Sequence, residues 1–174
     1  QIIQCHRALK PDGLFLGVML GGNTLAELRT VLAEAESRTR GGLSPRVAPM
    51  AEIRDLGGLL QRSGLNLPVV DSFEAVAEYQ DIWHLMRDLR AMGESNALAN
   101  RLRRFTARVV FSEAQRIYAE NFSQPGSSRL RATFEILCLT GWAPDDSQPK
   151  PLRPGSATAR LAEALGTTET PLRD

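Results

Sequence analysis

The most informative segment of this chain reads Arg7-Ala8-Leu9-Lys10-Pro11-Asp12-Gly13, then Leu14-Phe15-Leu16-Gly17-Val18-Met19-Leu20-Gly21-Gly22. Proline presets the backbone angle φ for a turn, and the Asp-Gly pair that follows completes that turn. The next seven residues are apolar apart from Gly17, a pattern that favours a strand covered on both faces. The segment therefore predicts the end of a helix, a tight turn and a buried strand over 14–20, which stops at two glycines.

The composition is that of an ordinary globular protein of 174 residues, which favours one domain with a substantial core. A net charge of +1 gives no electrostatic reason to expect nucleic acid or a membrane surface as a partner. No apolar run approaches the roughly 20 residues of a membrane span, and no signal peptide is visible. We therefore predict no nucleic-acid partner and no membrane span.

The cysteines and histidines do not follow a metal-binding pattern. Cys5, His6, His84 and Cys138 lack the spacing of metal ligands. Both cysteines lie in apolar surroundings, which favours buried free thiols over a disulfide framework. We predict structural roles for all four residues and no metal site.

Hydrophobic periodicity predicts helices that alternate with strands, and this order favours an α/β fold with a mostly parallel sheet. Thr24 with Glu27, and Ser112 with Gln115, have the spacing of capping boxes at helix starts. Pro68 at the start of the second strand predicts an edge position. The expected helices are 2–9, 24–37, 50–63, 81–92 and 112–121, and the expected strands are 14–20, 67–70 with extended chain to 79, and 130–142.

The chain changes character at its C-terminal end. Residues 1–142 carry the periodic segments, whereas half of the ten prolines fall within 143–174. We expect a proline-rich tail there, with little regular structure except a short helix at 157–165. The chain also opens at Gln1 in what looks like the middle of a helix, so we expect either a piece of a longer domain or a processed chain.

Several segments, in order, resemble class I S-adenosylmethionine-dependent methyltransferases. Leu9–Gly13 resembles their "LKPGG" turn before the fifth strand. Gly21–Arg29, Gly41–Pro45 and Asp88–Asn96 are similar to "GGDTLYELR", "GGFSP" and "DLQGMGESN" of the mitochondrial complex I assembly factor five family and its bacterial relatives. A second similarity is to the malonyl carrier-protein methyltransferase of biotin synthesis. The resemblance implies the C-terminal half of a Rossmann-like fold, with three strands, the last one antiparallel between the other two, and a helical insert over about 81–128.

The resemblance implies S-adenosylmethionine as the ligand and a role in respiratory complex I assembly, with arginine hydroxylation as the chemistry of the mitochondrial member. One alternative is carboxyl O-methylation of an acyl-carrier substrate, and another is a non-catalytic module that holds a protein such as a respiratory-chain subunit. The resemblance implies that the donor site, with its glycine-rich turn, lies upstream of this chain. No G-x-G-x-x-G turn follows a strand here, so we expect the fragment alone to be inactive. The expected location is the bacterial cytoplasm, or the mitochondrial matrix in a eukaryote.

The substrate-pocket candidates lie in two loops and on one helix. Gly21, Gly22, Asn23 and Thr24 follow the carboxyl end of a strand, where ligands of open α/β sheets bind, although a tight turn and a helix cap explain them equally well. Arg29 in the next helix either reaches a carboxylate or, as surface statistics favour, is solvated or ion-paired. The resemblance implies that the insert forms a lid over the acceptor pocket and that its loop 92–96 lines this pocket, although a helix end alone would explain the loop. Its residues are Met92, Gly93, Glu94, Ser95 and Asn96.

Two further features bear on partners. The arginines at 101, 103, 104 and 108 fit either a solvated helix face or a patch for an anion or a protein partner. Strand 14–20 would have an open edge, which proteins normally cover or pair. We therefore expect homo-oligomerisation or pairing with another chain at that strand.

Overall fold

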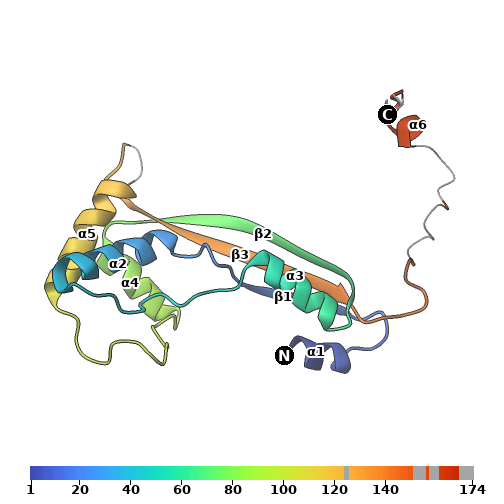
Figure 1. Ribbon diagram of the computed structural model, residues 1–174, viewed down its shortest axis with the longest axis horizontal. Coiled ribbons are helices and arrows are strands. Elements are labelled where there is room, and N and C mark those ends of the chain that lie inside the picture. Colours follow the sequence, from blue (N-terminus) through green and yellow to red (C-terminus); the bar gives the residue numbers. More distant parts are fainter. Residues whose placement is uncertain (124–125, 151–155, 157–160, 169–174) are drawn as a thin grey trace, which may run out of the picture. The chain divides into compact units, whose positions relative to one another are not determined.

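The computed structural model describes residues 1–123, 126–150, 156 and 161–168. The chain forms two compact units, Gln1–Pro144 and Asp145–Asp174. The described residues of the second unit include one short helix, α6 (Leu161–Leu165). The helix expected at 157–165 therefore falls partly outside the described residues. The described residues of the first unit form five helices and three strands (Figure 1). The helices are α1 (Ile2–Ala8), α2 (Ala26–Arg40), α3 (Ile53–Arg62), α4 (Ile82–Ala91) and α5 (Arg108–Asn121), and the strands are β1 (Leu14–Leu20), β2 (Asn66–Tyr79) and β3 (Leu130–Trp142).

The three strands form one sheet in the order β1-β3-β2 (Figure 1). The last strand lies between the other two and is antiparallel to both, with Leu14 opposite Trp142 and Tyr79 opposite Leu130. This arrangement, with α4 and α5 inserted between β2 and β3, confirms the predicted half of a methyltransferase-like fold. The prediction of a mostly parallel sheet is wrong, because the inserted strand makes every hydrogen-bonded strand pair antiparallel.

Two of the three strands have the predicted limits, and the middle one is longer than predicted. The predicted burial of strand 14–20 on both faces is wrong, because all its side chains are exposed or partly exposed; Leu16 and Val18, for example, are 63% and 64% exposed. β2 runs without a break from Asn66 to Tyr79, so the extended chain after residue 70 belongs to the same strand. Pro68 lies at a register shift between Asn66 and Val69, on an edge strand as predicted. A proline has no backbone N–H to donate to the ladder, so it is tolerated at such an irregular position of an edge strand.

Two apolar clusters hold the first unit together. Burying such side chains stabilises a fold by roughly 1.5–3 kcal/mol for each large residue. The smaller cluster lies under α3 and holds Leu56, Leu60, Leu65, Leu137 and Leu139. The larger cluster joins α2, α4 and α5 to the start of β3 and includes Leu28, Val31, Ile82, Leu85, Val110, Ile117, Tyr118 and Leu130.

Neither predicted capping box forms. The N-cap residue of α2 is Leu25, whose φ is 55°, and that of α5 is Ala107. α5 starts four residues before the predicted helix, and neither N-cap residue makes a side-chain hydrogen bond to its helix. Gln115 instead accepts a hydrogen bond from the Ile82 backbone N–H at 2.7 Å, so it caps a different helix, α4. Both pairs have the three-residue spacing of a capping box, but Thr24 and Gln115 bond to residues in distant parts of the chain instead of to the starts of their own helices.

The thiols are more accessible than predicted, because Cys5 is exposed and Cys138 is half-buried. His6 Nδ1 lies 2.8 Å from the Ser63 carbonyl oxygen, and His84 Nδ1 lies 2.9 Å from a carboxylate oxygen of its helix cap, Asp81. Within the described residues, no group of three or more histidine, cysteine or acidic side chains is placed to hold a metal ion. None of the helices in the described part of the chain combines the length and apolarity needed to cross a bilayer.

Candidate functional site

The loop after β1 is fastened to β3. The Thr24 hydroxyl is buried, donating to the Glu135 carbonyl and accepting from the Glu135 N–H, both at 3.1 Å. The Glu27 carboxylate accepts from the Thr133 hydroxyl at 2.5 Å and from the Thr133 N–H at 3.2 Å. The pair predicted as a helix cap therefore attaches the start of α2 to the central strand.

The backbone N–H groups of this loop are already used. Gly21 donates to the Glu135 carbonyl, Gly22 to the Ala51 carbonyl, Thr24 to the Gly21 carbonyl, and Asn23 to the Glu135 carboxylate. A Cβ on Gly21 would collide with the Glu135 carboxylate, and one on Gly22 would collide with a neighbouring carboxylate. The glycines therefore admit carboxylates of the chain itself, which favours the tight-turn interpretation over an anion cradle.

Arg29 is bound to the same loop. Its Nη2 donates to the Gly22 carbonyl at 3.2 Å and to the Thr24 carbonyl at 3.3 Å. Its Nε is buried and has no hydrogen-bond partner among the described residues. These contacts hold the turn against α2. Arg29 forms no ion pair with any described residue and is not simply solvated.

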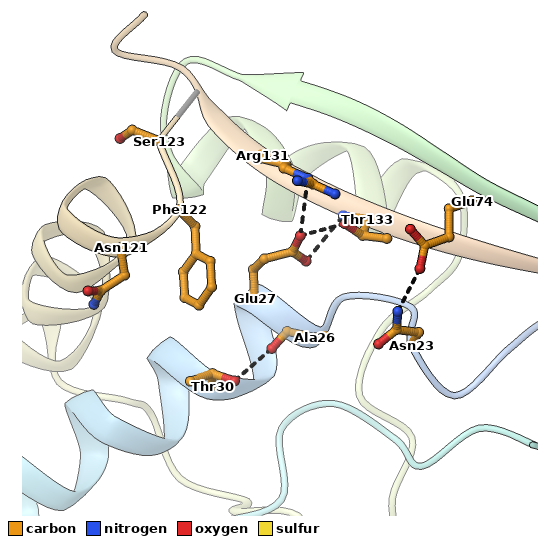
Figure 2. A pocket seen from close by; sticks show the side chains of 10 residues that line it. All are labelled: Asn23, Ala26, Glu27, Thr30, Glu74, Asn121, Phe122, Ser123, Arg131 and Thr133. Atoms are coloured by element: carbon orange, nitrogen blue, oxygen red, sulfur yellow. Dashed lines mark hydrogen bonds and ion pairs between the residues drawn. The ribbon is translucent and has the colours of Figure 1, made fainter. Parts of the chain in front are cut away.

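A cavity of about 510 Å³, here called the polar pocket, lies where α2 begins and α5 ends. Figure 2 shows the Glu27 carboxylate directed at Thr133 and Arg131, and Asn23 directed at Glu74. The Asn23 amide donates to Glu74 at 2.7 Å, and Arg131 Nε lies 3.9 Å from Glu27 Oε1. Of the predicted site residues, only Asn23 lines this pocket, and its neighbours already bond to one another. The lining comprises Asn23, Ala26, Glu27, Thr30, Glu74, Asn121, Phe122, Ser123, Arg131 and Thr133.

A second cavity of about 280 Å³, here called the apolar pocket, lies between α2, α4 and two loops. Glu94, Ser95 and Asn96 form part of its wall, so three of the five predicted residues of that loop meet in one pocket. Met92 and Gly93 lie outside the lining: the Met92 side chain is exposed, and Gly93 has a φ of 84° at the end of α4. The remaining lining residues are Leu25, Leu28, Leu32, Arg46, Val47, Ala48, Met50, Met86, Leu89, Arg90 and Phe111.

Sequence reasoning missed the loop that faces Glu94–Asn96 across this pocket. Arg46 in that loop donates to the buried Glu36 carboxylate and, through Nη1, to the Thr106 hydroxyl at 3.0 Å. Its guanidinium carbon lies 6.0 Å from the centre of the Phe111 ring. The family resemblance at Gly41–Pro45 pointed to this loop, but it assigned no role to any side chain there.

Glu36 organises this loop from α2. Its side chain is fully buried and accepts hydrogen bonds from the Ser44 N–H at 2.8 Å, from the Ser44 hydroxyl and from Arg46. Burial by itself raises the pKa of Glu36, but the hydrogen bonds from Arg46 and Ser44 outweigh burial and hold the pKa below its ordinary value. The loop is further joined to the opposite wall, because the Asn96 amide donates to the Pro45 carbonyl at 2.9 Å.

No family model matches this chain. Individual known proteins, however, are similar to it over most of its length. It is 43% identical over 160 residues to arginine-hydroxylase NDUFAF5 of Danio rerio, which covers 92% of this chain and 49% of that protein. The human NDUFAF5 is 41% identical over 160 residues, covering 92% of this chain and 46% of that protein. This chain is a relative of NDUFAF5.

A further relative, malonyl-[acyl-carrier protein] O-methyltransferase of Laribacter hongkongensis, is 34% identical over 143 residues, or 82% of this chain and 45% of that protein. The resemblance to NDUFAF5 and to class I methyltransferases inferred from the sequence is thereby confirmed. The chain spans less than half the length of each of these relatives. A solved structure from Bacillus halodurans C-125, described as a methyltransferase, aligns with a TM-score of 0.42 at 12% identity, over 83% of this chain and 62% of that one.

The apolar pocket is suited to hold a side chain with an aliphatic arm and a charged end. Its lining combines a mostly apolar body with one carboxylate, Glu94, and two guanidinium groups, Arg46 and Arg90. As far as the chain is described, Glu94 and Ser95 are the lining side chains of a type that acts as general base or nucleophile, and the lining has no histidine, cysteine or lysine. The apolar pocket of this relative of NDUFAF5 therefore combines a mostly apolar lining with charged groups of both signs.

Proposed function

We propose that this chain is the acceptor-binding part of an S-adenosylmethionine-dependent, methyltransferase-like protein. Its acceptor site would be the apolar pocket, and Met92–Asn96 would be part of a lid. The observation that carries the proposal is that Glu94, Ser95 and Asn96 wall this pocket together with α2 and α4. Ligand pockets are typically apolar with a few convergent polar groups, which is the composition seen here.

The relatives named arginine-hydroxylase suggest a protein-bound arginine as the acceptor. The aliphatic arm of such an arginine would pack against the apolar lining, and its guanidinium would meet the carboxylate of Glu94. The family resemblance adds respiratory complex I assembly as the setting and a respiratory-chain subunit as the protein that carries the arginine. The location would be the mitochondrial matrix in a eukaryote and the cytoplasm in a bacterium.

The loop after β1 does not offer the methyl donor a site. The loop after β1 donates its backbone N–H groups within the chain, and carboxylates fill the space beside Gly21 and Gly22. The proposal therefore assigns donor binding to polypeptide outside this chain. It predicts that the 174-residue chain alone does not bind S-adenosylmethionine.

A carboxyl O-methyltransferase is the second candidate, favoured by Arg46 and Arg90 in the same lining. These two guanidinium groups would hold a carboxylate end, as a malonyl substrate presents. The third candidate is a non-catalytic module that holds a protein partner without turnover.

Nuclear magnetic resonance titration of the ¹⁵N-labelled chain separates the three candidates. N-acetyl-L-arginine methylamide should shift the backbone signals of 89–96, and E94Q should weaken this binding about tenfold, the effect of losing roughly 1.4 kcal/mol. The matched control is E78Q, which removes the same charge from an exposed position on β2. Shifts by malonate alone, lost in R90Q, would replace the arginine acceptor with a carboxylate. No response to either probe would overturn the acceptor site and leave the non-catalytic module.

A further inference from the structure

Four arginines gather in the loop between α4 and α5 and at the start of α5. Between Glu94 and Glu113 the chain carries Arg101, Arg103, Arg104 and Arg108 and no acidic residue, although the whole chain has a net charge of only +1. All four are exposed. Only Arg108 lies in a helix, so the interpretation of these residues as one solvated helix face is wrong. The loop extends away from the helices in Figure 1.

These arginines lack acidic partners among the described residues, unlike several arginines of α2, α5 and the neighbouring loop. Arg38 and Arg116 both pair with Glu113, and Arg46 pairs with Glu36. For the four arginines of the loop no ion pair forms with any described residue; Arg101 donates only to the backbone carbonyl of Leu98. Their charge is therefore available to a partner.

Exposed apolar groups accompany this charge. The Phe105 side chain is 104% exposed, directly beside Arg104. Leu43, from the neighbouring loop, is 71% exposed. A hollow of about 250 Å³ lies between the two loops, and it is lined by Glu36, Arg40, Gly42, Leu43, Ser44, Leu102 and Arg104. We call Arg101, Arg103, Arg104, Phe105 and Arg108, together with this hollow, the arginine surface.

We propose that the arginine surface docks an acidic segment of a partner protein, whose carboxylates meet the arginines and whose apolar side chain enters the hollow. Arginine and aromatic residues are the types that dominate binding energy at protein interfaces. The guanidinium fork matches a carboxylate with two parallel hydrogen bonds. A protein offers a single side chain that fits a hollow, whereas a bilayer surface does not. Nucleic acid is disfavoured because Phe105 is the one exposed aromatic in this loop available for base stacking.

The arginine surface adjoins the apolar pocket through shared contacts. Arg46, in the pocket wall, donates to the hydroxyl of Thr106, next to Phe105. Asn96, at the other end of the loop, donates to Pro45 beside the same wall. A segment docked here would therefore lie next to the pocket, which makes the partner the protein that carries the acceptor. That last assignment rests on the proposed function, whereas the docking surface does not.

Selection from a random twelve-residue phage-display library against the immobilised chain tests the proposal without a preconceived partner. The enriched peptides should carry an excess of aspartate and glutamate around an apolar residue. The best of them, synthesised with a fluorescent label, should bind the chain, and its Kd should rise as salt is added, because exposed charge pairs are screened.

Variants then locate the binding. R103E/R104E should abolish measurable binding, and F105A should weaken it at least fivefold. The matched control R54E/R62E makes the same charge change at exposed positions of α3 and should leave binding unchanged. Enrichment of neutral or basic peptides, binding that survives R103E/R104E, or no enrichment at all would overturn the proposal. Binding instead to vesicles of phosphatidylcholine with phosphatidylserine, lost in the same variants, would make the surface a membrane contact and also overturn it. E94Q should not change peptide binding, so failure here is distinguishable from failure of the acceptor pocket.

Discussion

Single polar side chains decide how α2 is placed. Thr24 and Glu27 are buried, and each has hydrogen-bond partners on β3 that lie 111 and 106 residues later in the chain, respectively. A buried carboxylate is tolerated only when its oxygens accept hydrogen bonds. These residues are consequently part of the tertiary structure rather than of a local helix cap.

Replacing Thr133 by valine tests the anchor of α2 to β3. T133V keeps the shape of the side chain but removes the hydroxyl that donates to Glu27 at 2.5 Å. We expect the free energy of unfolding to fall by about 1–3 kcal/mol, because the buried carboxylate loses a donor. Urea unfolding measures the change. The control T30V removes an exposed hydroxyl that donates to Ala26 within α2, and should cost no more than about 0.5 kcal/mol.

Glu36 should make the stability depend on pH. Its pKa in the folded chain lies below the ordinary value of 4.5, so its ionised form stabilises the fold above that value. This contribution is lost as the pH falls through the folded pKa. E36Q should therefore be less stable than the wild type by about 2–3 kcal/mol near neutral pH, and the difference should shrink below about pH 4.

The measurement is urea unfolding of both proteins across this pH range. E34Q, at a more accessible position of the same helix, is the control and should differ from the wild type by no more than about 0.5 kcal/mol throughout. A gap between E36Q and wild type that stays constant with pH would show that the Glu36 carboxylate is not the group responsible.

At the scale of elements, strands were easier to predict than helix starts. The limits 14–20 follow from a continuous apolar run and the limits 130–142 from alternating apolar residues, and both are correct. The starts of α2 and α5 are wrong, because Thr24 and Gln115 bond to residues far along the chain instead of to their own helices. A spacing of three residues is equally compatible with both outcomes, so only the folded structure distinguishes them.

The candidate site shows the same limit. Glu94–Asn96 was predictable from the resemblance, because a literal match includes those residues. Arg46 was not, because its place in the pocket depends on Glu36, ten residues earlier, and on Thr106, sixty residues later. Contacts between two irregular loops leave no periodic trace in the sequence.

The end of α2 offers a matched pair of glycines. Gly41 has a φ of 65° and donates its N–H to the Ser37 carbonyl at 3.0 Å, as a helix-ending residue in the left-handed region does. G41A should reduce the free energy of unfolding by about 1–2 kcal/mol, because a Cβ is strained there. Gly42 has open space around it and no left-handed φ, so G42A should be neutral or slightly stabilising. Equal effects in urea unfolding would contradict the backbone argument.

At the scale of the whole molecule, one face of the sheet is notably apolar and open. Leu137 and Leu139 face α3 and are buried. On the opposite face, Leu16 is 63% exposed and Val18 is 64% exposed. Phe73 of β2, 55% exposed, lies on this same face, because cross-strand partners in register share a face. β1 is also an edge strand, with β3 as its one hydrogen-bonded neighbour within the described residues. Exposed apolar strands at a free edge favour association.

This combination predicts concentration-dependent self-association of the purified chain through β1. Analytical ultracentrifugation over micromolar to millimolar concentrations should show a dimer or larger species. L16K/V18K places two charges on the open face without touching the buried one, so the double variant should remain monomeric with an unchanged circular dichroism spectrum. The control I53K/L59K adds the same charge at part-exposed positions of α3 and should associate like the wild type. A wild-type chain that stays monomeric throughout would mean that the open face and edge of β1 do not drive self-association, and pairing with a different polypeptide would then be the remaining prediction for that strand.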